Sequence, residues 1–235
     1  MASSLFEKAY FRIAGDCGLL VEYGDAIDPA VNQKVRSMAI VVQNNMPDGV
    51  REIIPTYRSI LIYYDPLITN PAMLKETLTD LESGLSEIKI PPPKVVEIPV
   101  CYGGDYGPDI EHVAQSHNLT LQEVIDLHSE PEYLIYMVGF TPGFPFLGGL
   151  PEVLHTPRLK TPRTLVPRGS VGIANGQTGV YPIASPGGWQ LIGRTPISLF
   201  SPERSSPILY QAGDRIRFKP TSPSDYQRLS DMEDS

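Results

Sequence analysis

The sequence predicts an α+β protein in which a small α/β sandwich precedes a domain of short strands. In the first 90 residues, pairs of strand-like segments alternate with single amphipathic helices. A triple proline at residues 91–93 then interrupts the chain, because proline neither continues a helix nor donates to a sheet. We therefore expect a sandwich over residues 1–90, a second domain over residues 94–220 and a flexible polar tail over residues 221–235.

The first domain is expected to contain four strands and two helices. The strands are predicted at residues 10–14, 18–23, 50–54 and 60–64. Each helix begins at an N-cap residue followed by proline, at Asp28 and at Asn70. Apolar residues follow each cap at helical spacing and give each helix one buried face: Val31, Val35, Met38 and Val42, then Leu74, Leu78, Leu81 and Leu85. A ferredoxin-like arrangement is the simplest fold of this kind.

The second domain is expected to be built mainly of short strands. Strands are predicted at residues 94–100 and 133–138, and an alternating edge strand at residues 215–218. Short helices are predicted to begin near Asp109 and at Thr120, where Thr120-Leu121-Gln122-Glu123 forms a capping box. Many short strands with few helical turns favour a closed β-barrel.

Residues 139–196 are the part of the chain most expected to carry function. About one residue in three is glycine or proline, yet aromatic side chains are interleaved with them, so the segment can bury surface and fold. No Asp or Glu occurs from Val153 to Pro202, although the whole chain has a net charge of −8. This pattern indicates an anionic ligand or an acidic partner, although solvated surface arginines explain it equally well.

Several classes of protein are excluded by what the sequence lacks. It has no P-loop for nucleotide phosphates and no His-Glu-x-x-His motif, and its histidines lack metal-ligand spacing, so no metal site is expected. Its acidic balance argues against nucleic acid. It contains no signal peptide and no apolar run long enough for a membrane span. Cys17 and Cys101 match neither zinc nor redox spacing, and we expect reduced thiols in a cytoplasmic protein.

Seven residues are candidates for substrate binding or for an interface, and no catalytic residue is assigned. Arg168 either presents its guanidinium to an anion or is an exposed residue of a hairpin turn. Gln177, Thr178 and Tyr181 either orient an amide or carboxylate substrate or are turn residues and a core tyrosine. Trp189 is either the aromatic wall of a pocket or part of the core, and Phe144 to Leu147 form either core or an interface. His128, near a helix C-terminus, is either a cation that suits the helix dipole or a general base. The seven candidates are Arg163, Arg168, Gln177, Thr178, Tyr181, Ser185 and Trp189.

Six motifs follow one another in this region, at residues 139–149, 162–163, 166–171, 177–182, 185–189 and 192–196. Together with Gly107-Pro108-Asp109, they resemble the family of KipI and allophanate hydrolase subunit 1, which includes the B-type subunits of 5-oxoprolinases. A typical member of this family has alanine in place of Arg168. The family pattern therefore gives no support to an anion-binding role for that arginine.

The resemblance implies a ferredoxin-like N-terminal domain followed by a cyclophilin-like β-barrel. It also implies a subunit of an ATP-dependent 5-oxoprolinase, inactive alone, that acts with A-like and C-like subunits to open 5-oxo-L-proline to L-glutamate. ATP would then bind at a partner or across an interface. Two other functions stay open: a KipI-like inhibitor that binds a sensor histidine kinase, and a carboxyltransferase-type subunit of a urea carboxylase-like enzyme. The latter needs biotin from another chain, because no Met-Lys-Met occurs here.

Overall fold

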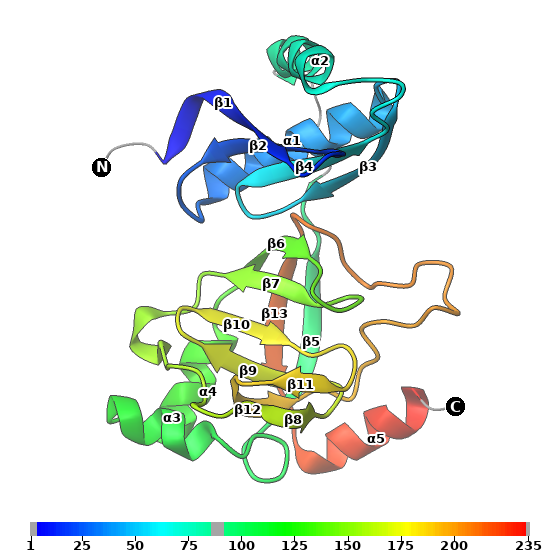
Figure 1. The fold of residues 1–235 in the computed structure, drawn as a ribbon. Coiled ribbons are helices and arrows are strands. Elements are labelled where there is room, and N and C mark those ends of the chain that lie inside the picture. The colour runs from blue at the N-terminus through cyan, green and yellow to red at the C-terminus, as the bar shows by residue number, and fades with distance from the viewer. Residues whose placement is uncertain (1–3, 86–91, 234–235) are drawn as a thin grey trace. The chain divides into compact units, whose positions relative to one another are not determined.

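The structure is a computed structural model that describes residues 4–85 and 92–233 (Figure 1). The chain divides between Pro92 and Pro93 into two compact units, and each is described by itself. Pro91, the first residue of the triple proline, lies outside the described residues.

The first unit is a four-stranded antiparallel sheet with the strand order β1-β2-β4-β3. Apolar side chains on one face of the sheet form a single core with side chains of both helices. Each predicted N-cap is present: Asp28 Oδ1 accepts from Ala30 N at 2.8 Å, and Asn70 Oδ1 accepts from Ala72 N at 3.0 Å. The elements are β1 (Leu5–Ala14), β2 (Gly18–Gly24), α1 (Pro29–Asn44), β3 (Val50–Pro55), β4 (Ser59–Tyr64) and α2 (Pro71–Ser83).

The ferredoxin-like prediction for this unit is not confirmed. A ferredoxin-like fold has the element order β-α-β-β-α-β, whereas the order here is β-β-α-β-β-α. Gly15 adopts a left-handed conformation with a φ of 68° in the tight turn that joins β1 to β2. The resulting hairpin supplies one edge of the sheet from the N-terminal end of the unit.

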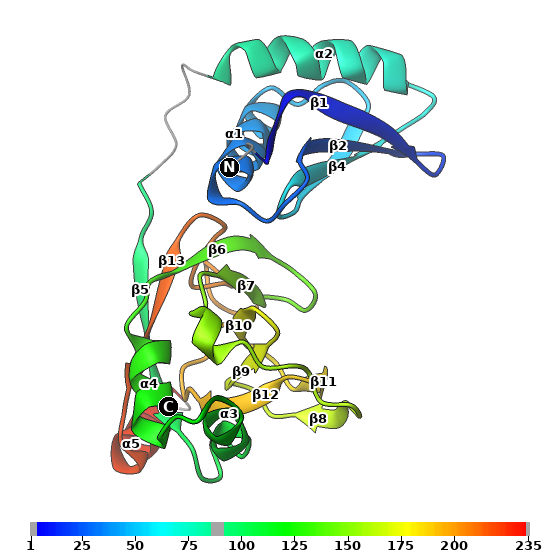
Figure 2. The ribbon, with the colours of Figure 1, turned by 90° about the vertical axis from the view of Figure 1, so that its left-hand side faces the viewer.

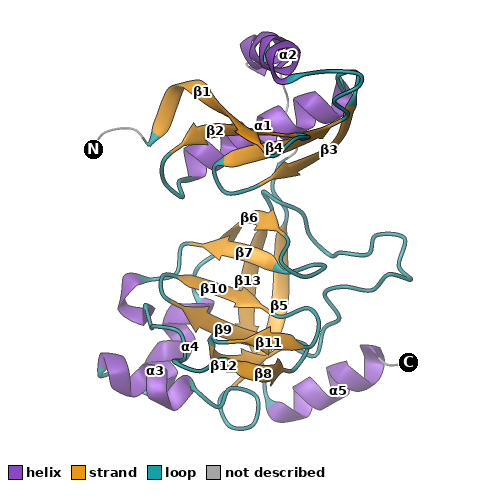
Figure 3. Ribbon diagram, in the orientation of Figure 1, coloured by secondary structure: helices purple, strands orange, loops and turns teal. Residues whose placement is uncertain are grey.

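The second unit is built around a seven-stranded sheet with the order β10-β9-β12-β5-β13-β6-β7 (Figure 3). Its two end strands, β10 and β7, lie against each other, so the sheet forms a nearly closed barrel. A separate two-stranded sheet pairs β11 with β8. The strands are β5 (Val95–Tyr102), β6 (Tyr133–Val138), β7 (Pro145–Gly148), β8 (Arg163–Val166), β9 (Ser170–Ala174), β10 (Gln177–Val180), β11 (Ser185–Gly187), β12 (Gln190–Arg194) and β13 (Arg215–Pro220).

Apolar side chains of the second unit form two separate clusters. The larger one fills the barrel and includes Val171, Ile173 and Ile192, together with residues of α3 (Ile110–His117) and α4 (Leu121–Ser129). The smaller one includes Ala174 of β9 and Leu191 of β12, next to strand residues that face the barrel. Figure 2 shows strands β8 and β11 close to β9 and β12. We call the smaller cluster the aromatic cluster; it consists of Phe144, Val166, Ala174, Tyr181, Trp189 and Leu191.

The strand predicted at the sheet edge, β13, lies in the middle of the sheet. It pairs in parallel with β5 and antiparallel with β6. Its side chains do alternate, because Ile216 and Phe218 are fully buried while their neighbours are not. Alternation reports that one face of a strand is buried, but it carries no information on whether both backbone edges are paired.

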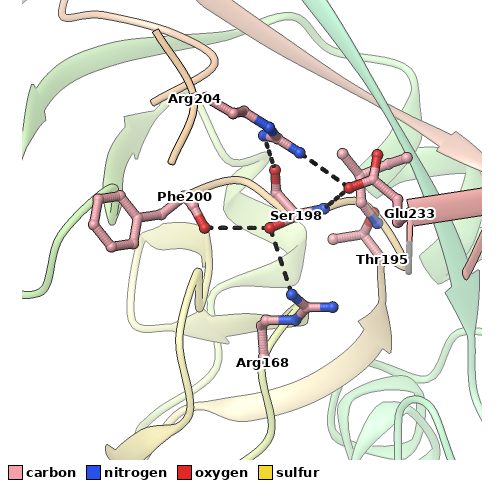
Figure 4. Close-up of polar contacts among 7 residues, drawn as sticks. Arg168, Thr195, Ser198, Phe200, Arg204 and Glu233 are labelled. Atoms are coloured by element: carbon pink, nitrogen blue, oxygen red, sulfur yellow. Dashed lines mark hydrogen bonds and ion pairs between the residues drawn. The ribbon is translucent and has the colours of Figure 1, made fainter. Parts of the chain in front are cut away.

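Residues 221–235 were expected to form a flexible polar tail, but Pro223–Glu233 form helix α5. The hydroxyl of Ser222 accepts a hydrogen bond from a backbone N–H of the first turn, at 3.1 Å. At the other end, Glu233 accepts from Ser198 N at 3.0 Å and pairs with Arg204 at 3.1 Å (Figure 4). These tertiary contacts stabilise a helix that has no fully buried residue of its own.

Candidate functional site

A pocket of about 170 Å³ opens at the aromatic cluster of the second unit. A cavity of about 150 Å³ holds a molecule of the size of benzene, so the volume suits one small ring rather than a nucleotide. We call it the aromatic pocket; its lining residues are Phe140, Phe144, Phe146, Arg158, Tyr181, Pro186, Gly187, Gly188 and Trp189.

Edge-to-face ring contacts make the pocket wall rigid. The ring of Phe144 lies at the centre, with centroid distances of 5.1 Å to Phe146, 5.5 Å to Tyr181 and 5.7 Å to Trp189. Each such contact stabilises by about 0.5–1.5 kcal/mol beyond the burial of area. The wall of the pocket is thus made of aromatic rings that contact one another.

Glycine allows the backbone to approach these rings closely. A Cβ atom at Gly187 would lie 2.5 Å from the hydroxyl oxygen of Tyr181, and one at Gly179 would lie 3.1 Å from the ring of Trp189. The first distance is a clash and the second is tight. These two glycines therefore let the backbone pack against the aromatic side chains of the cluster.

Phe140 holds an exposed ring at the pocket in a strained backbone conformation. Its φ is 65°, in a region where a bulky residue is an outlier that costs about 1–3 kcal/mol. The turn is closed by hydrogen bonds from Gly139 N to Phe144 O at 3.0 Å and from Phe144 N to Thr141 O at 3.0 Å. The side chain is 72% exposed, so little burial offsets the strain. Such outliers concentrate at ligand sites.

Arg158 brings a positive charge to the mouth of the pocket. Its guanidinium carbon lies 5.9 Å from the ring centroid of Trp189, within the range of a cation–π contact. The side chain is exposed, and no carboxylate among the described residues pairs with it. Burial raises the pKa of Tyr181, with Arg158 and Arg163 opposing, so this wall presents a neutral hydroxyl beside the guanidinium.

Arg163 positions the pocket wall instead of facing a ligand. Its guanidinium makes two hydrogen bonds to the carboxylate of Asp109, at 2.7 and 2.8 Å, and a third to Trp189 O at 3.2 Å. The same carboxylate accepts from Leu191 N at 2.6 Å. The Arg163–Asp109 pair thus fixes the start of β12, directly after Trp189.

Thr178 belongs to a hydrogen-bond chain inside the barrel. Its hydroxyl donates to Gly172 O at 3.1 Å and lies 2.8 Å from Nε2 of His128, so that nitrogen is the donor. Nδ1 of His128 lies 2.8 Å from the hydroxyl of Tyr102 and accepts from it. Burial lowers the pKa of His128 to about 3, so the ring is neutral. The prediction of a cation at this position is wrong, and a fully buried ring is not placed to serve as a general base.

The seven candidate residues therefore do not all belong to one site. Only Tyr181 and Trp189 line the aromatic pocket. Ser185 is adjacent to it in β11, and its hydroxyl is buried without a hydrogen-bond partner among the described residues. Gln177 begins β10, and Arg168 lies in the β8–β9 turn with Nη1 3.4 Å from the hydroxyl of Ser198 (Figure 4).

Phe140, Phe146 and Arg158 were not predicted as members of one site. The signals were present, since Arg158 lies in the segment without acidic residues and Phe140 follows a glycine in the first motif. Their meeting with Trp189 depends on strand pairings that a motif does not reveal. Within residues 4–85 and 92–233, no three His, Cys, Asp or Glu side chains gather as a metal site would require. None of the described helices is long and apolar enough to cross a membrane.

Comparison with known proteins supports the resemblance seen in the motifs. The family model for the carboxyltransferase domain, subdomain C and D, matches residues 9–210. The chain is 43% identical to the B-type subunit of 5-oxoprolinase from Bacillus subtilis, over 90% of this chain and 92% of that protein. It is 42% identical to the corresponding 5-oxoprolinase subunit of Escherichia coli O157:H7, over 91% and 97% of the two chains.

Solved structures share the fold. The crystal structure of TTHA0988 is 36% identical, with a TM-score of 0.78, over 87% of this chain; this chain spans only 39% of that one. The urea carboxylase of Kluyveromyces lactis also has a TM-score of 0.78, at 22% identity, over 98% of this chain and 24% of that one. At this low identity, the likeness to the urea carboxylase shows a shared fold and nothing about function.

Proposed function

The chain belongs to the family of carboxyltransferase domains, subdomain C and D, and from this premise we propose that it is the B-type subunit of an ATP-dependent 5-oxoprolinase. The assembly would open 5-oxo-L-proline to L-glutamate while ATP is hydrolysed. One observation carries the proposal: identity of 43% over nine tenths of both chains to a protein named as the B-type subunit of 5-oxoprolinase. A cytoplasmic location is part of the proposal, because ATP is available there.

The proposed reaction has a chemical reason for needing ATP. The lactam of 5-oxoproline is a resonance-stabilised amide that resists attack by water. Transfer of a phosphoryl group from ATP to the lactam oxygen releases ADP and makes the ring carbon electrophilic. Water then attacks that carbon, the C–N bond breaks to give the amine, and a second water releases phosphate and leaves the new carboxylate. Positioned cationic and N–H groups stabilise the anion that develops in such steps.

This chain is proposed to act on the side of 5-oxoproline rather than on that of ATP. Its aromatic pocket has the volume of one small ring, and its sequence has no P-loop. ATP is therefore assigned to an A-like or C-like partner subunit or to an interface with one. It follows that the chain alone should be inactive.

The proposal is tested by ATP hydrolysis in mixtures of this chain with the two candidate partner subunits. We expect ADP to form in a 5-oxoproline-dependent manner only when all three chains are present. A mixture of three well-folded chains that hydrolyses no ATP with 5-oxoproline would contradict the proposal, as would full activity in the mixture lacking this chain.

A second candidate is a carboxyltransferase-type subunit of a biotin-dependent enzyme, which the description of the matching family model favours. Avidin separates the two, because it sequesters biotin and would abolish carboxyl transfer while leaving 5-oxoprolinase activity intact. No relative reported above is named for kinase inhibition, so a sensor histidine kinase is not part of the proposal.

A further inference from the structure

Arg158 is the arginine that lines the pocket. Arg163, which supports the pocket wall from outside, is paired with Asp109. Arg158 is exposed at the pocket mouth, and no described carboxylate pairs with it. Because no Asp or Glu occurs from Val153 to Pro202, none of its chain neighbours can neutralise it. Its guanidinium can therefore donate a pair of hydrogen bonds to an anion.

Aromatic rings stand beside this cation. Trp189 turns its ring toward Arg158, and Phe144 and Tyr181 contact Trp189 at interplanar angles of 89° and 80°. Such a wall suits the planar atoms of a small ring, and the volume of about 170 Å³ accommodates one. The pocket thus combines one positive charge with a slot for one ring.

We infer that the aromatic pocket binds a small cyclic monocarboxylate, with the carboxylate on Arg158 and the flat ring against Trp189. The identity of the ligand rests on the proposed function, under which it is 5-oxo-L-proline. That molecule is a five-membered ring with a planar lactam and one carboxylate, so a single guanidinium matches its charge.

The same chemistry disfavours the ring-opened product. L-Glutamate carries an ammonium group and a second carboxylate in addition to the first. In a pocket with one guanidinium and mainly apolar walls, these extra charges would lose water without gaining partners. The pocket should therefore hold the cyclic substrate more tightly than the product, which aids product release.

The test uses the full chain and the fluorescence of Trp189, which is its only tryptophan and thus reports on the pocket. Titration with 5-oxo-L-proline should give a saturable change in emission, and equilibrium dialysis with the labelled compound should give the same dissociation constant. 2-Pyrrolidinone, the same ring without the carboxylate, should bind at least about tenfold more weakly, because a charge-assisted hydrogen bond is lost. L-Glutamate should also bind more weakly.

Arg158→Gln should raise the dissociation constant of 5-oxo-L-proline at least about tenfold, without loss of folded structure because the side chain is exposed. Arg168→Gln is the matched control, since Arg168 lies in the same acid-free segment but outside the pocket, and it should leave binding unchanged. The inference is overturned if dialysis detects no binding by the folded chain, if 2-pyrrolidinone binds equally well, or if Arg158→Gln has no effect.

The outcomes separate this inference from the proposed function. In an active three-subunit mixture, Arg158→Gln should raise the KM for 5-oxo-L-proline and leave the KM for ATP unchanged. An active mixture in which neither KM changes would overturn the inference and leave the proposed function standing. If the chain binds 5-oxo-L-proline but no mixture is active, the proposed function is overturned and the inference about the pocket stands.

Discussion

At the scale of single residues, Trp189 is held by groups that lie outside the pocket. Its carbonyl accepts from Arg163, and the N–H two residues later donates to Asp109. Arg163 and Asp109 are in turn bound to each other. The orientation of the main pocket wall therefore depends on one partly buried ion pair.

Asp109→Asn should destabilise the protein by about 2 kcal/mol, because it leaves the Arg163 guanidinium without its charge partner in a partly buried site. Urea unfolding measures this change. The matched control is Glu97→Gln, which removes an exposed carboxylate that pairs with Arg217 and Lys219. Its effect should stay below about 1 kcal/mol. Equal effects of the two substitutions would contradict the account.

The buried His128 makes the free energy of unfolding depend on pH. In the folded protein its pKa is lowered to about 3, whereas its ordinary value is 6.5, so between these values the unfolded chain binds the extra proton. The free energy of unfolding should therefore fall as pH falls from about 6.5, by at most about 1.4 kcal/mol per unit. Urea titrations at about pH 7, 6 and 5 should show a steeper fall for the native protein than for His128→Gln. Parallel slopes would argue against a neutral, buried histidine.

At the scale of elements, features that depend on neighbouring residues were predicted, whereas features that depend on distant strand pairing or contacts were not. The N-caps at Asp28 and Asn70 and the capping box at Thr120 were predicted, because the side chain and the backbone group it caps are neighbours in sequence. The position of β13 and the formation of α5 were not, because they depend on partners far away in the sequence. In the first unit the order of elements along the chain agrees with the predicted one, and the ferredoxin-like fold named for it has a different order.

In the candidate site, too, residue types were predicted from the sequence but their spatial grouping was not. Trp189 was predicted as a pocket wall or as core, and it is nearly buried yet lines the pocket. Tyr181 was predicted to orient a substrate or to belong to the core, and it too is buried and lines the pocket. Thr178 follows Gln177 in one motif but faces the barrel interior, where it bonds to His128. Successive side chains of a strand point to opposite faces, so neighbours in a motif need not share a site.

Strand β11 depends on a glycine. Gly187→Ala would place a methyl group 2.5 Å from the hydroxyl oxygen of Tyr181 and force the ring to move. We expect a loss of about 1–3 kcal/mol in the free energy of unfolding and a shifted Trp189 emission. Gly188→Ala is the matched control, because its nearest neighbour would be Pro162 at 3.6 Å, an ordinary contact. A change for Gly188→Ala as large as that for Gly187→Ala would refute this description of the wall.

At the scale of the whole molecule, the aromatic pocket and its supporting ion pair lie within the second unit. No sheet among the described residues takes strands from both units. A chain of residues 93–235 should therefore fold alone, unfold cooperatively and keep the Trp189 emission of the full chain. Circular dichroism and fluorescence measure this, and a fragment that unfolds without cooperativity would show that the barrel needs the first unit.

Under the proposed function, the chain is a necessary subunit of an enzyme that opens 5-oxo-L-proline. The most direct measurement is the conversion of labelled 5-oxo-L-proline to labelled glutamate, with ATP, by the two partner subunits in the presence and absence of this chain. We predict that glutamate forms only when the chain is present. Glutamate formation at the same rate without the chain, or none in the complete mixture of folded subunits, would contradict the claim.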